Sequence, residues 1–348
     1  MSVLQRRSVP RAGSDDIDGA IARGVAFLAG EQRPDGGVPG FYRDPGSDPF
    51  PCTDIFPATM LAHALESVPE AAGVRAKAAG FLAAEMGAGG LWNFYPREAS
   101  QRRWFPDDID DTVCATAALR AAGLAVPPNE RLIFANRNGQ GLFYTWFADA
   151  QRRPRPAISR FVGDCMLRVR QLLGRPVIFS ADWVFRNTVA SPYDIDAAVN
   201  ANVLFHFGLR EETQPVISYL LSVLRSGTEV GCDKWYRNPF LVLYFIARAL
   251  APHSPEGLAL VRERLAARTA GTPLERAAAL CAAAHCGLGL DTDLVRALLE
   301  AQASTGSWPA EPIYWGGDRA WGADAVTTAL AIEALALCRH PHLADRAT

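Results

Sequence analysis

The stretch WFPDDIDDTVCATAALRAAG, residues 104–123, places four aspartates within five positions and then runs directly into an alanine-rich segment of helical character. One or two aspartates at a helix start are ordinary, because they cap free N–H groups and suit the positive end of the helix dipole. Four such groups repel one another, and in a buried site one of them can be forced to keep its proton. A helix cap, a metal site and a retained carboxylic acid proton are therefore three open explanations.

The overall composition indicates a chain that can bury a large core. It has 348 residues, of which 49% are hydrophobic and 21% charged, and a net charge of −2, so no nucleic-acid partner is expected. No apolar run reaches the roughly 18 residues of a spanning helix. The seven cysteines lie mostly among apolar residues, which favours thiols in a reducing cytoplasm. Residues 1–14 are expected to be a loose leader, because they lack the apolar segment of a secretory signal.

Hydrophobic periodicity predicts twelve helices that alternate between two types. The first type carries more charge and should face water, whereas the second is apolar on most sides and should be buried. The first type comprises residues 16–30, 70–86, 127–137, 213–227, 255–268 and 292–303. The second type comprises residues 54–68, 108–124, 194–209, 239–251, 273–287 and 322–337. Six outer and six inner helices in alternation predict an all-α fold, an (α/α)6 toroid formed by one domain over residues 15–343.

Related turns after four outer helices support a repeat architecture. Each has a glycine two residues before a large side chain, and the first three glycines recur at intervals of about 50 residues. The turns are Gln32–Gly36–Val38, Met86–Gly90–Trp92, Arg137–Gly141–Phe143 and Gln302–Gly306–Trp308. Glycine can end the outer helix and let the large side chain pack back over the turn.

The inner helices should bring their first residues together at one end of a central cavity. Three of them begin alike, in CTDIFPAT, DDIDDTVC and YDIDAAVN. The cavity mouth would then collect carboxyl groups from several helices, namely Asp54, Asp108, Asp110, Asp111, Asp194, Asp196 and Asp324. Asn200 lies four residues after Asp196, on the same helical face, and is read as a polar cavity residue or as part of a buried capping network.

At this point the sequence resembles a known family. The stretch PDDIDDTVCATAAL resembles the DxDD motif of class II terpene cyclases and squalene–hopene cyclases, and the glycine turns resemble their QW motifs. The C-terminal YWGGDRAWGADAVTTALAIEAL resembles the end of the same superfamily. The match is partial, since position 38 is Val and positions 86 and 137 lack Gln.

The resemblance implies a cyclisation started by protonation of a linear prenyl substrate, such as a C15 or C20 prenyl diphosphate. Asp110 would be the general acid, and Asp108 and Asp111 would hold its proton in place. Aromatic faces would stabilise the carbocation. The substrate cavity is expected to contain Trp104, Phe105, Asp54, Asp194, Asp196, Asn200, Trp235, Tyr236, Tyr314, Trp315 and Trp321.

A diphosphate head group would need cations near the inner-helix starts. Arg102, Arg103, Lys234 and Arg237 are the candidates. Mg²⁺ is expected at most as a counter-ion of the diphosphate, with no metal bound by the protein itself and no organic cofactor.

Two other classes of function stay open. DDIDD also fits the DDxxD spacing of magnesium-dependent terpene synthases, but their second metal motif is not found. Cys281 and His285, four residues apart in CAAAHCG, suggest a zinc enzyme of the prenyltransferase type, but the remaining ligand pattern is absent. The third class is a non-catalytic toroid that binds a prenyl group or a protein partner.

The segment 144–192 is a basic insert much longer than a usual helix connection. Residues 157–175 alternate basic and apolar groups, which favours contact with a membrane surface or a solvated helix against the rim. Enzymes of the resembled family usually have two domains with the active site between them, so a lone domain needs a cover. We expect the insert to fold over the cavity with Phe161, Ile178, Phe179, Trp183 and Phe185 turned inward. Otherwise, a partner subunit or a second copy would complete the site.

Overall fold

The computed structural model describes residues 14–148, 182–289 and 291–339. All twelve predicted helices are present within this part of the chain. The outer helices are α1 (Ser14–Glu31), α3 (Ala72–Glu85), α5 (Glu130–Ala135), α10 (Gln214–Ser226), α12 (Pro255–Ala266) and α14 (Thr292–Glu300). The inner helices are α2 (Phe56–Ala64), α4 (Ile109–Ala121), α9 (Ala197–Phe207), α11 (Pro239–Leu250), α13 (Pro273–His285) and α15 (Asp324–Arg339). Shorter elements are α8 (Asp182–Asn187), η1 (Pro69–Ala71) and η2 (Arg102–Trp104).

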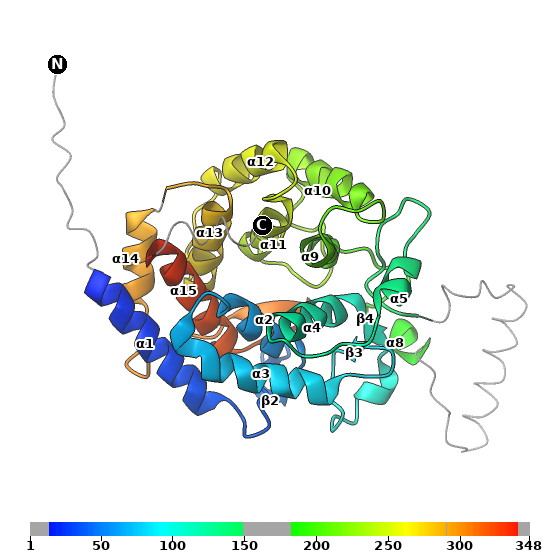
Figure 1. Ribbon diagram of the computed structural model, residues 1–348, viewed down its shortest axis with the longest axis horizontal. Coiled ribbons are helices and arrows are strands. Elements are labelled where there is room, and N and C mark those ends of the chain that lie inside the picture. Colours follow the sequence, from blue (N-terminus) through cyan, green and yellow to red (C-terminus); the bar gives the residue numbers. More distant parts are fainter. Residues whose placement is uncertain (1–13, 149–181, 290, 340–348) are drawn as a thin grey trace, which may run out of the picture.

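The inner helices form a closed ring. Each packs against the next in the order α2, α4, α9, α11, α13 and α15, and α15 returns to pack against α2 (Figure 1). The outer helices flank this ring, and α1 packs on α15. Burial follows the predicted division, because every residue of α11 from Phe240 to Leu250 is buried, whereas only Gly257 and Val261 are buried in α12.

The glycine turns join neighbouring outer helices. All four predicted glycines have positive φ angles, between 73° and 92°, a conformation that a Cβ disfavours. Gln32 Nε2 donates to the carbonyl oxygens of Gly36 and of Val74 on α3, both at 3.1 Å. Gln302 Nε2 makes the same pair of bonds, to Gly306 and to Ala20 on α1, both at 2.9 Å. These bonds link one outer helix to the next and also link the last to the first.

The large side chains after two of these glycines make matching contacts. Trp92 Nε1 donates to the Leu82 carbonyl at 2.8 Å, and Trp308 Nε1 donates to the Leu298 carbonyl at 2.7 Å. The backbone N–H groups of the two tryptophans bond threonine hydroxyls on the following inner helices, Thr112 and Thr328, both at 3.0 Å. Thr112 lies directly after the aspartate cluster, so this contact fixes where α4 starts.

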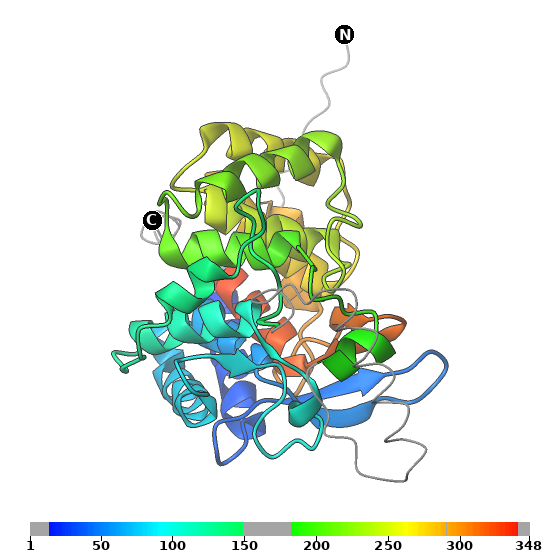
Figure 2. The same cartoon turned by 90° about the vertical axis from the view of Figure 1, so that its right-hand side faces the viewer.

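The structure also contains antiparallel strands that the all-α prediction missed. A four-stranded sheet has the order β2 (Phe50–Thr53), β1 (Pro39–Arg43), β6 (Arg319–Gly322) and β5 (Pro312–Gly316). A second, two-stranded sheet pairs β3 (Trp92–Asn93) with β4 (Asp107–Asp108), and Asp108 also bridges to Trp146. The hairpin of β1 and β2 projects from the body of the protein (Figure 2).

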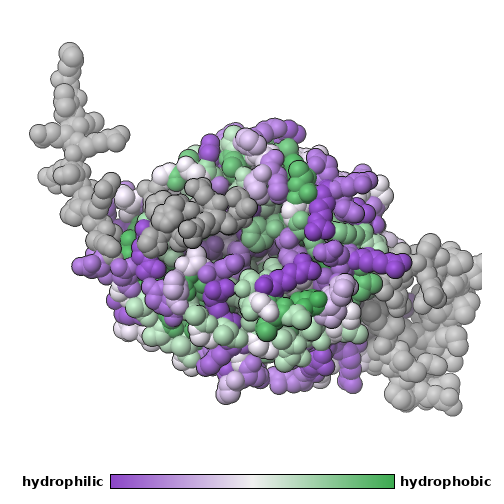
Figure 3. Space-filling model, viewed as in Figure 1, coloured by the Kyte–Doolittle hydropathy of each residue, from purple (hydrophilic) through white to green (hydrophobic). Residues whose placement is uncertain are grey.

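Within the described ranges, no helix combines the length and the apolar character that crossing a bilayer requires. Hydrophilic residues predominate on the face shown in Figure 3, with smaller hydrophobic patches between them. Residues 1–13 of the predicted leader and the membrane-contact segment 157–175 lie outside the described residues, while Ser14 begins α1.

Candidate active site

Three of the four aspartates in the cluster form the start of α4, where they are almost completely buried, whereas Asp107 is half-buried in β4. Asp108 is the N-cap, and its Oδ1 accepts a hydrogen bond from the Asp111 backbone N–H at 2.7 Å. Asp110 and Asp111 lie in the first turn, where the helix dipole favours negative charge. The three side chains are only 4%, 8% and 2% exposed, in the order Asp108, Asp110 and Asp111. Capping thus accounts for one of the three carboxyl groups and leaves two to be explained.

Asp110 is held by two donors from other inner elements of the fold. Tyr236 Oη donates to its Oδ2 at 2.5 Å, and Asn202 Nδ2 donates to its Oδ1 at 2.6 Å. Burial raises the pKa of Asp110, while these two bonds and the charge of Arg248 oppose the rise. Asp110 therefore keeps its proton to a higher pH in this site than it would in water. The same site offers hydrogen-bond donors that stabilise the carboxylate once the proton has left.

Asp108 and Asp111 retain a proton between them. Burial raises the pKa of Asp108 to about 8, and the nearby charges of Asp110 and Asp107 add to the rise. Burial followed by the charge of Asp108 raises the pKa of Asp111 well above its ordinary range. Asp111 Oδ1 has no hydrogen-bond partner among the described residues. Two carboxyl groups this close cannot both ionise at neutral pH.

The cluster opens onto a cavity of about 590 Å³ with mainly aromatic walls. Its volume lies within the range of small-molecule sites. The exposed Val189 and Asp318 also line it, so the cavity reaches solvent on that side. The aromatic lining consists of Phe56, Phe94, Tyr95, Phe105, Trp146, Trp235, Tyr236, Tyr314, Trp315 and Trp321.

The structure brings most of the predicted aromatic residues into this wall. Phe105, Trp235, Tyr236, Tyr314, Trp315 and Trp321 all line the cavity together with Asp108, Asp110 and Asp111. Trp104 instead lies against Trp183, with ring centroids 5.5 Å apart, and is not part of the wall. Asp54 lines a neighbouring cavity of about 520 Å³. A hydrogen bond joins the walls of the two cavities, because Tyr314 Oη donates to Asp54 Oδ2 at 2.8 Å. Burial raises the pKa of Asp54 to about 6.

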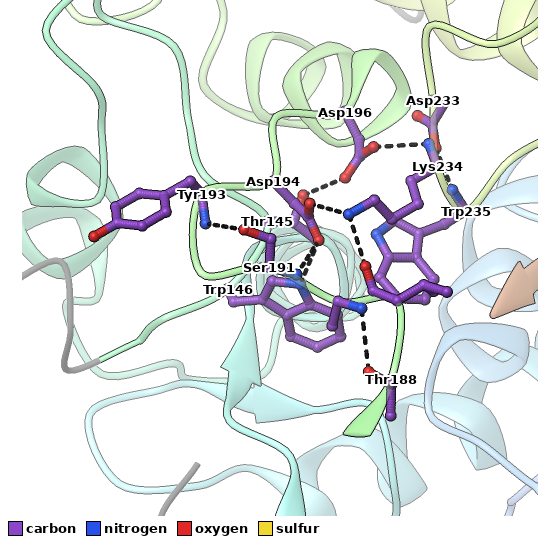
Figure 4. A network of polar contacts seen from close by, with 12 residues as sticks. Thr145, Trp146, Thr188, Ser191, Tyr193, Asp194, Asp196, Asp233, Lys234 and Trp235 are labelled. Atoms are coloured by element: carbon purple, nitrogen blue, oxygen red, sulfur yellow. Dashed lines mark hydrogen bonds and ion pairs between the residues drawn. The ribbon is translucent and has the colours of Figure 1, made fainter. Parts of the chain in front are cut away.

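Asp194 and Asp196 belong to a polar network beside the cavity (Figure 4). Asp196 Oδ2 accepts a bond from Thr145 Oγ1 at 2.6 Å, and its Oδ1 accepts one from the Lys234 backbone N–H at 2.8 Å. Asp194 pairs with the Lys234 ammonium group and accepts a bond from Trp146 Nε1 at 3.3 Å. The network therefore holds Thr145 and Trp146, which line the cavity, in place.

Two further polar residues near this network have structural contacts. Asn200 Oδ1 accepts a bond from the Phe143 N–H at 2.9 Å, and its Nδ2 donates to the Phe143 carbonyl at 3.1 Å. Asn200 thus holds the large residue after a glycine turn, as Thr112 holds Trp92, and it does not line the cavity. Asp233 Oδ1 accepts bonds from the backbone N–H groups of Trp235 and Tyr236 at 2.9 and 2.8 Å. Asp233 thereby sets the position of the tyrosine that bonds the Asp110 carboxyl group.

The four predicted diphosphate-binding cations lie outside the cavity wall. Lys234 and Arg237 bond the carbonyl oxygens of Val189 and Gly317. Arg102 pairs with a glutamate at 3.2 Å, and Arg103 lies 4.6 Å from the centre of the Trp104 ring. Among the described lining residues the one cation is Arg319, which Asp44 pairs at 2.6 Å.

Several of these residues gave little signal in the sequence. Asn202 sits in the apolar run of α9, and its contact with Asp110 spans 92 residues. Phe56, Phe94 and Trp146 had the ordinary signature of core aromatics. Arg319 was detectable in the sequence, because it is the basic residue of YWGGDRAWG, within the C-terminal stretch that resembles the end of the superfamily.

Of the cysteine and histidine proposed as a zinc pair, Cys281 is buried in the helical core and His285 is half-buried. Cys281 Sγ lies 3.9 Å from the Leu330 carbonyl oxygen, to which it donates. Burial lowers the pKa of His285 to about 4, and its Nε2 has no hydrogen-bond partner in the described ranges. Within those ranges, no three His, Cys, Asp or Glu side chains are arranged to hold a metal ion.

The end of the insert lies against the cavity. Val184 is fully buried in a small cluster with Trp146, and Phe185 packs on that cluster. Thr188 and Val189 line the cavity itself. Of the predicted lid residues, Trp183 and Phe185 are thus placed beside the site, while Phe161, Ile178 and Phe179 lie outside the described residues.

Comparison with known proteins identifies the fold. No protein-family model matches the sequence, and no curated protein matches it. Among solved structures, a protein from Actinoplanes is 20% identical with a TM-score of 0.66 over 92% of this chain and 98% of its own. The type II terpene cyclase MstE from Scytonema is 15% identical with a TM-score of 0.65 over 92% of this chain and 98% of its own. A variant of MstE in complex with its substrate geranylgeranyl dihydroxybenzoate is 15% identical with a TM-score of 0.66, over 94% of this chain and 98% of its own. The protein therefore has the fold of type II terpene cyclases, as the sequence predicted.

Proposed function

We propose that the protein is a class II terpene cyclase that cyclises a linear prenyl substrate after protonation by Asp110. The observation that carries this proposal is the placement of three buried carboxyl groups against the wall of an aromatic cavity. The likeness to MstE supports it, since variants of that type II terpene cyclase were solved with the substrate geranylgeranyl dihydroxybenzoate and with the product merosterolic acid A. We assign the closed ring of inner helices and its flanking helices to the (α/α)6 toroid.

The first chemical step is a proton transfer to an alkene. The O–H bond of Asp110 breaks, a C–H bond forms at the terminal carbon of the double bond, and the neighbouring carbon becomes cationic. Alkenes are very weak bases, so the acid must be strong and already in position. Tyr236 and Asn202 provide this strength, because their bonds, at 2.5 and 2.6 Å, stabilise the carboxylate that forms.

The later steps need a dry and aromatic environment. As each ring closes, the positive charge moves along the chain, and the faces of Trp235, Tyr314 and Trp321 can attract it. Ring closure ends when the last cation loses a proton or captures water. The aromatic walls delay water capture by keeping the chain away from solvent.

The proposed substrate is a C15 or C20 chain that carries a head group at the solvent side of the cavity. If that head group is a diphosphate, Arg102, Arg103, Lys234 and Arg237 would contact it outside the wall, and Mg²⁺ would only screen its charge. Chelation of Mg²⁺ should then weaken turnover without abolishing it.

The test is incubation of the purified protein with farnesyl diphosphate, geranylgeranyl diphosphate, squalene and geranylgeranyl dihydroxybenzoate, with products read by mass spectrometry. Cyclic products should form from at least one substrate and should disappear in Asp110→Asn. Asp324→Asn is the matched control, because this aspartate also begins an inner helix, where it bonds the Ala310 N–H at 2.7 Å, but does not line the cavity. Full activity of Asp110→Asn would exclude the acid assignment. Prenyl binding without any turnover would instead favour a non-catalytic binding protein.

A further inference from the structure

Arg248 is a buried cation on the side of Asp110 away from the cavity. It lies on α11, its side chain is 3% exposed, and it does not line the aromatic cavity. Its guanidinium group is surrounded by the rings of Phe205, Tyr244 and Phe245, at 4.7 to 5.0 Å from their centres. Burying a cation is costly unless it is compensated, so its position calls for an explanation.

The compensation for this charge lies in a chain of hydrogen bonds that ends at Asp110. Arg248 Nη2 donates to Asn202 Oδ1 at 2.5 Å, and Asn202 Nδ2 donates to Asp110 Oδ1 at 2.6 Å. In the other direction, Arg248 Nη1 lies 3.4 Å from Tyr244 Oη. This hydroxyl donates its one hydrogen to the Glu333 carboxyl group, whose two oxygens lie 3.0 and 3.1 Å away. The chain links three inner helices, α9, α11 and α15, to the start of α4.

The arginine decides which way the asparagine side chain faces. An asparagine amide can present either its oxygen or its NH₂ group to a neighbour. A guanidinium group has donors and no acceptors, so Arg248 can bond only the oxygen of Asn202. This contact leaves the NH₂ group facing Asp110. The opposite orientation would place two oxygen atoms together and would remove a donor from the carboxylate.

Building on the proposed cyclase function, we propose that Arg248 is a positioning residue that acts through Asn202 to keep Asp110 a strong proton donor. The donated hydrogen bond and the nearby positive charge both stabilise the carboxylate that exists after proton transfer. They are in place before the reaction starts and need no rearrangement during it. Arg248 never contacts the substrate, so it should affect the protonation step and leave substrate binding unchanged.

The test compares two substrates of equal chain length, one ending in an alkene and one ending in the corresponding epoxide. An epoxide oxygen is a much stronger base than an alkene, so it needs a weaker acid. Arg248→Met should lower kcat for the alkene about 10²-fold, as for the loss of one preorganised donor. It should lower kcat for the epoxide less than about tenfold and leave KM unchanged for both. Arg248→Lys should restore part of the alkene activity.

Two further variants separate this role from a structural one. Arg248→Met removes the positive charge that favours ionised Glu333, so Arg248→Met/Glu333→Gln should be studied beside it in case the single variant does not fold. Arg264→Met is the matched control, because it also removes a cation beside a buried glutamate: Arg264 Nε lies 2.8 Å from Oε1 of the fully buried Glu229. The control should lower turnover of both substrates equally. Equal losses in the Arg248 variants would overturn the proposal.

A measurement without turnover keeps this proposal separate from the cyclase function. The infrared carbonyl band of protonated Asp110 can be assigned by its loss in Asp110→Asn and then titrated. Arg248→Met should raise the pH at which the band disappears, and an unchanged titration would overturn the proposal. If the wild type converts neither substrate, the cyclase function fails while this titration still tests Arg248.

Discussion

The proton retained at Asp108 should be visible in the stability of the whole protein. Asp108 ionises near pH 4 in an unfolded chain, whereas burial raises its pKa in the folded protein to about 8. Between these values the folded protein binds the extra proton. The free energy of unfolding must therefore fall as the pH rises, by about 1.4 kcal/mol per pH unit for one such proton.

Replacing Asp108 by Asn removes this dependence and keeps the local geometry. Asparagine caps a helix as well as aspartate does, so the 2.7 Å bond to the Asp111 N–H should survive. We expect the stability of Asp108→Asn relative to wild type to increase by about 3 kcal/mol between about pH 5.5 and pH 7.5. The variant should also lose turnover, because a carboxyl group of the proposed catalytic cluster is removed. Gains in stability at active sites commonly reduce activity in this way.

The assay is urea unfolding followed by far-ultraviolet circular dichroism at several pH values in this window. The difference between variant and wild type cancels the titration of all other groups that the substitution does not affect. Asp324→Asn, at an exposed helix start, is the control and should run parallel to the wild type. A parallel curve for Asp108→Asn would refute the reasoning, because the proton would then not be held at this site.

Three further predictions concern single contacts. Tyr236→Phe removes the 2.5 Å donor to Asp110 and should lower turnover about 10²-fold with little change in melting temperature, so unchanged kinetics would contradict the role of this tyrosine. Gly306→Ala places a Cβ 2.4 Å from a carbonyl oxygen at a φ of +92°, so it should lower the free energy of unfolding in urea by about 3 kcal/mol or more. Gly123→Ala is the control, because its φ of +72° lies in open space, and it should cost about 1 kcal/mol. Lys234→Met leaves a buried carboxylate without its cation and should lower the free energy of unfolding by about 2 kcal/mol, so an unchanged unfolding midpoint would show that the ion pair in Figure 4 is unimportant.

The helices were predictable because their signals are local. The run FLVLYFIARAL is apolar on nearly every side, and the observed helix, Pro239–Leu250, begins where the prediction placed it. The glycine turns were equally local, and Gly36 and Gly306 both adopt the expected positive φ. The aspartate cluster could be located for the same reason, since its members are adjacent in sequence.

The sheet and the support of the acid could not be predicted in this way. Strand β1 pairs with β6, where Tyr42 faces Trp321, and nothing near either strand in the sequence encodes a partner so far away. Asn202 and Arg248 interrupt apolar helices as single polar residues. The role of such a residue depends on the partner that its side chain contacts. Asn202 on α9 bonds Asp110 on α4, and Arg248 on α11 bonds Asn202, so both partners lie on other helices.

The bonds of Gln302 have a consequence for chain connectivity. Gln302 joins α14 to α1 by the same bond that Gln32 uses to join α1 to α3, so the join between the last and first outer helices resembles an internal one. Arg339, at the end of α15, pairs with Asp18 at 3.0 Å, so the two ends of the described chain are neighbours. A short linker could therefore connect them, and the chain could be reopened between α12 and α13. The new ends would belong in this connection, whose residues are exposed or half-buried, because the α10–α11 loop carries Tyr236, the donor to Asp110. Such a circular permutant should keep the ring, because the contacts that close it do not depend on where the polypeptide begins.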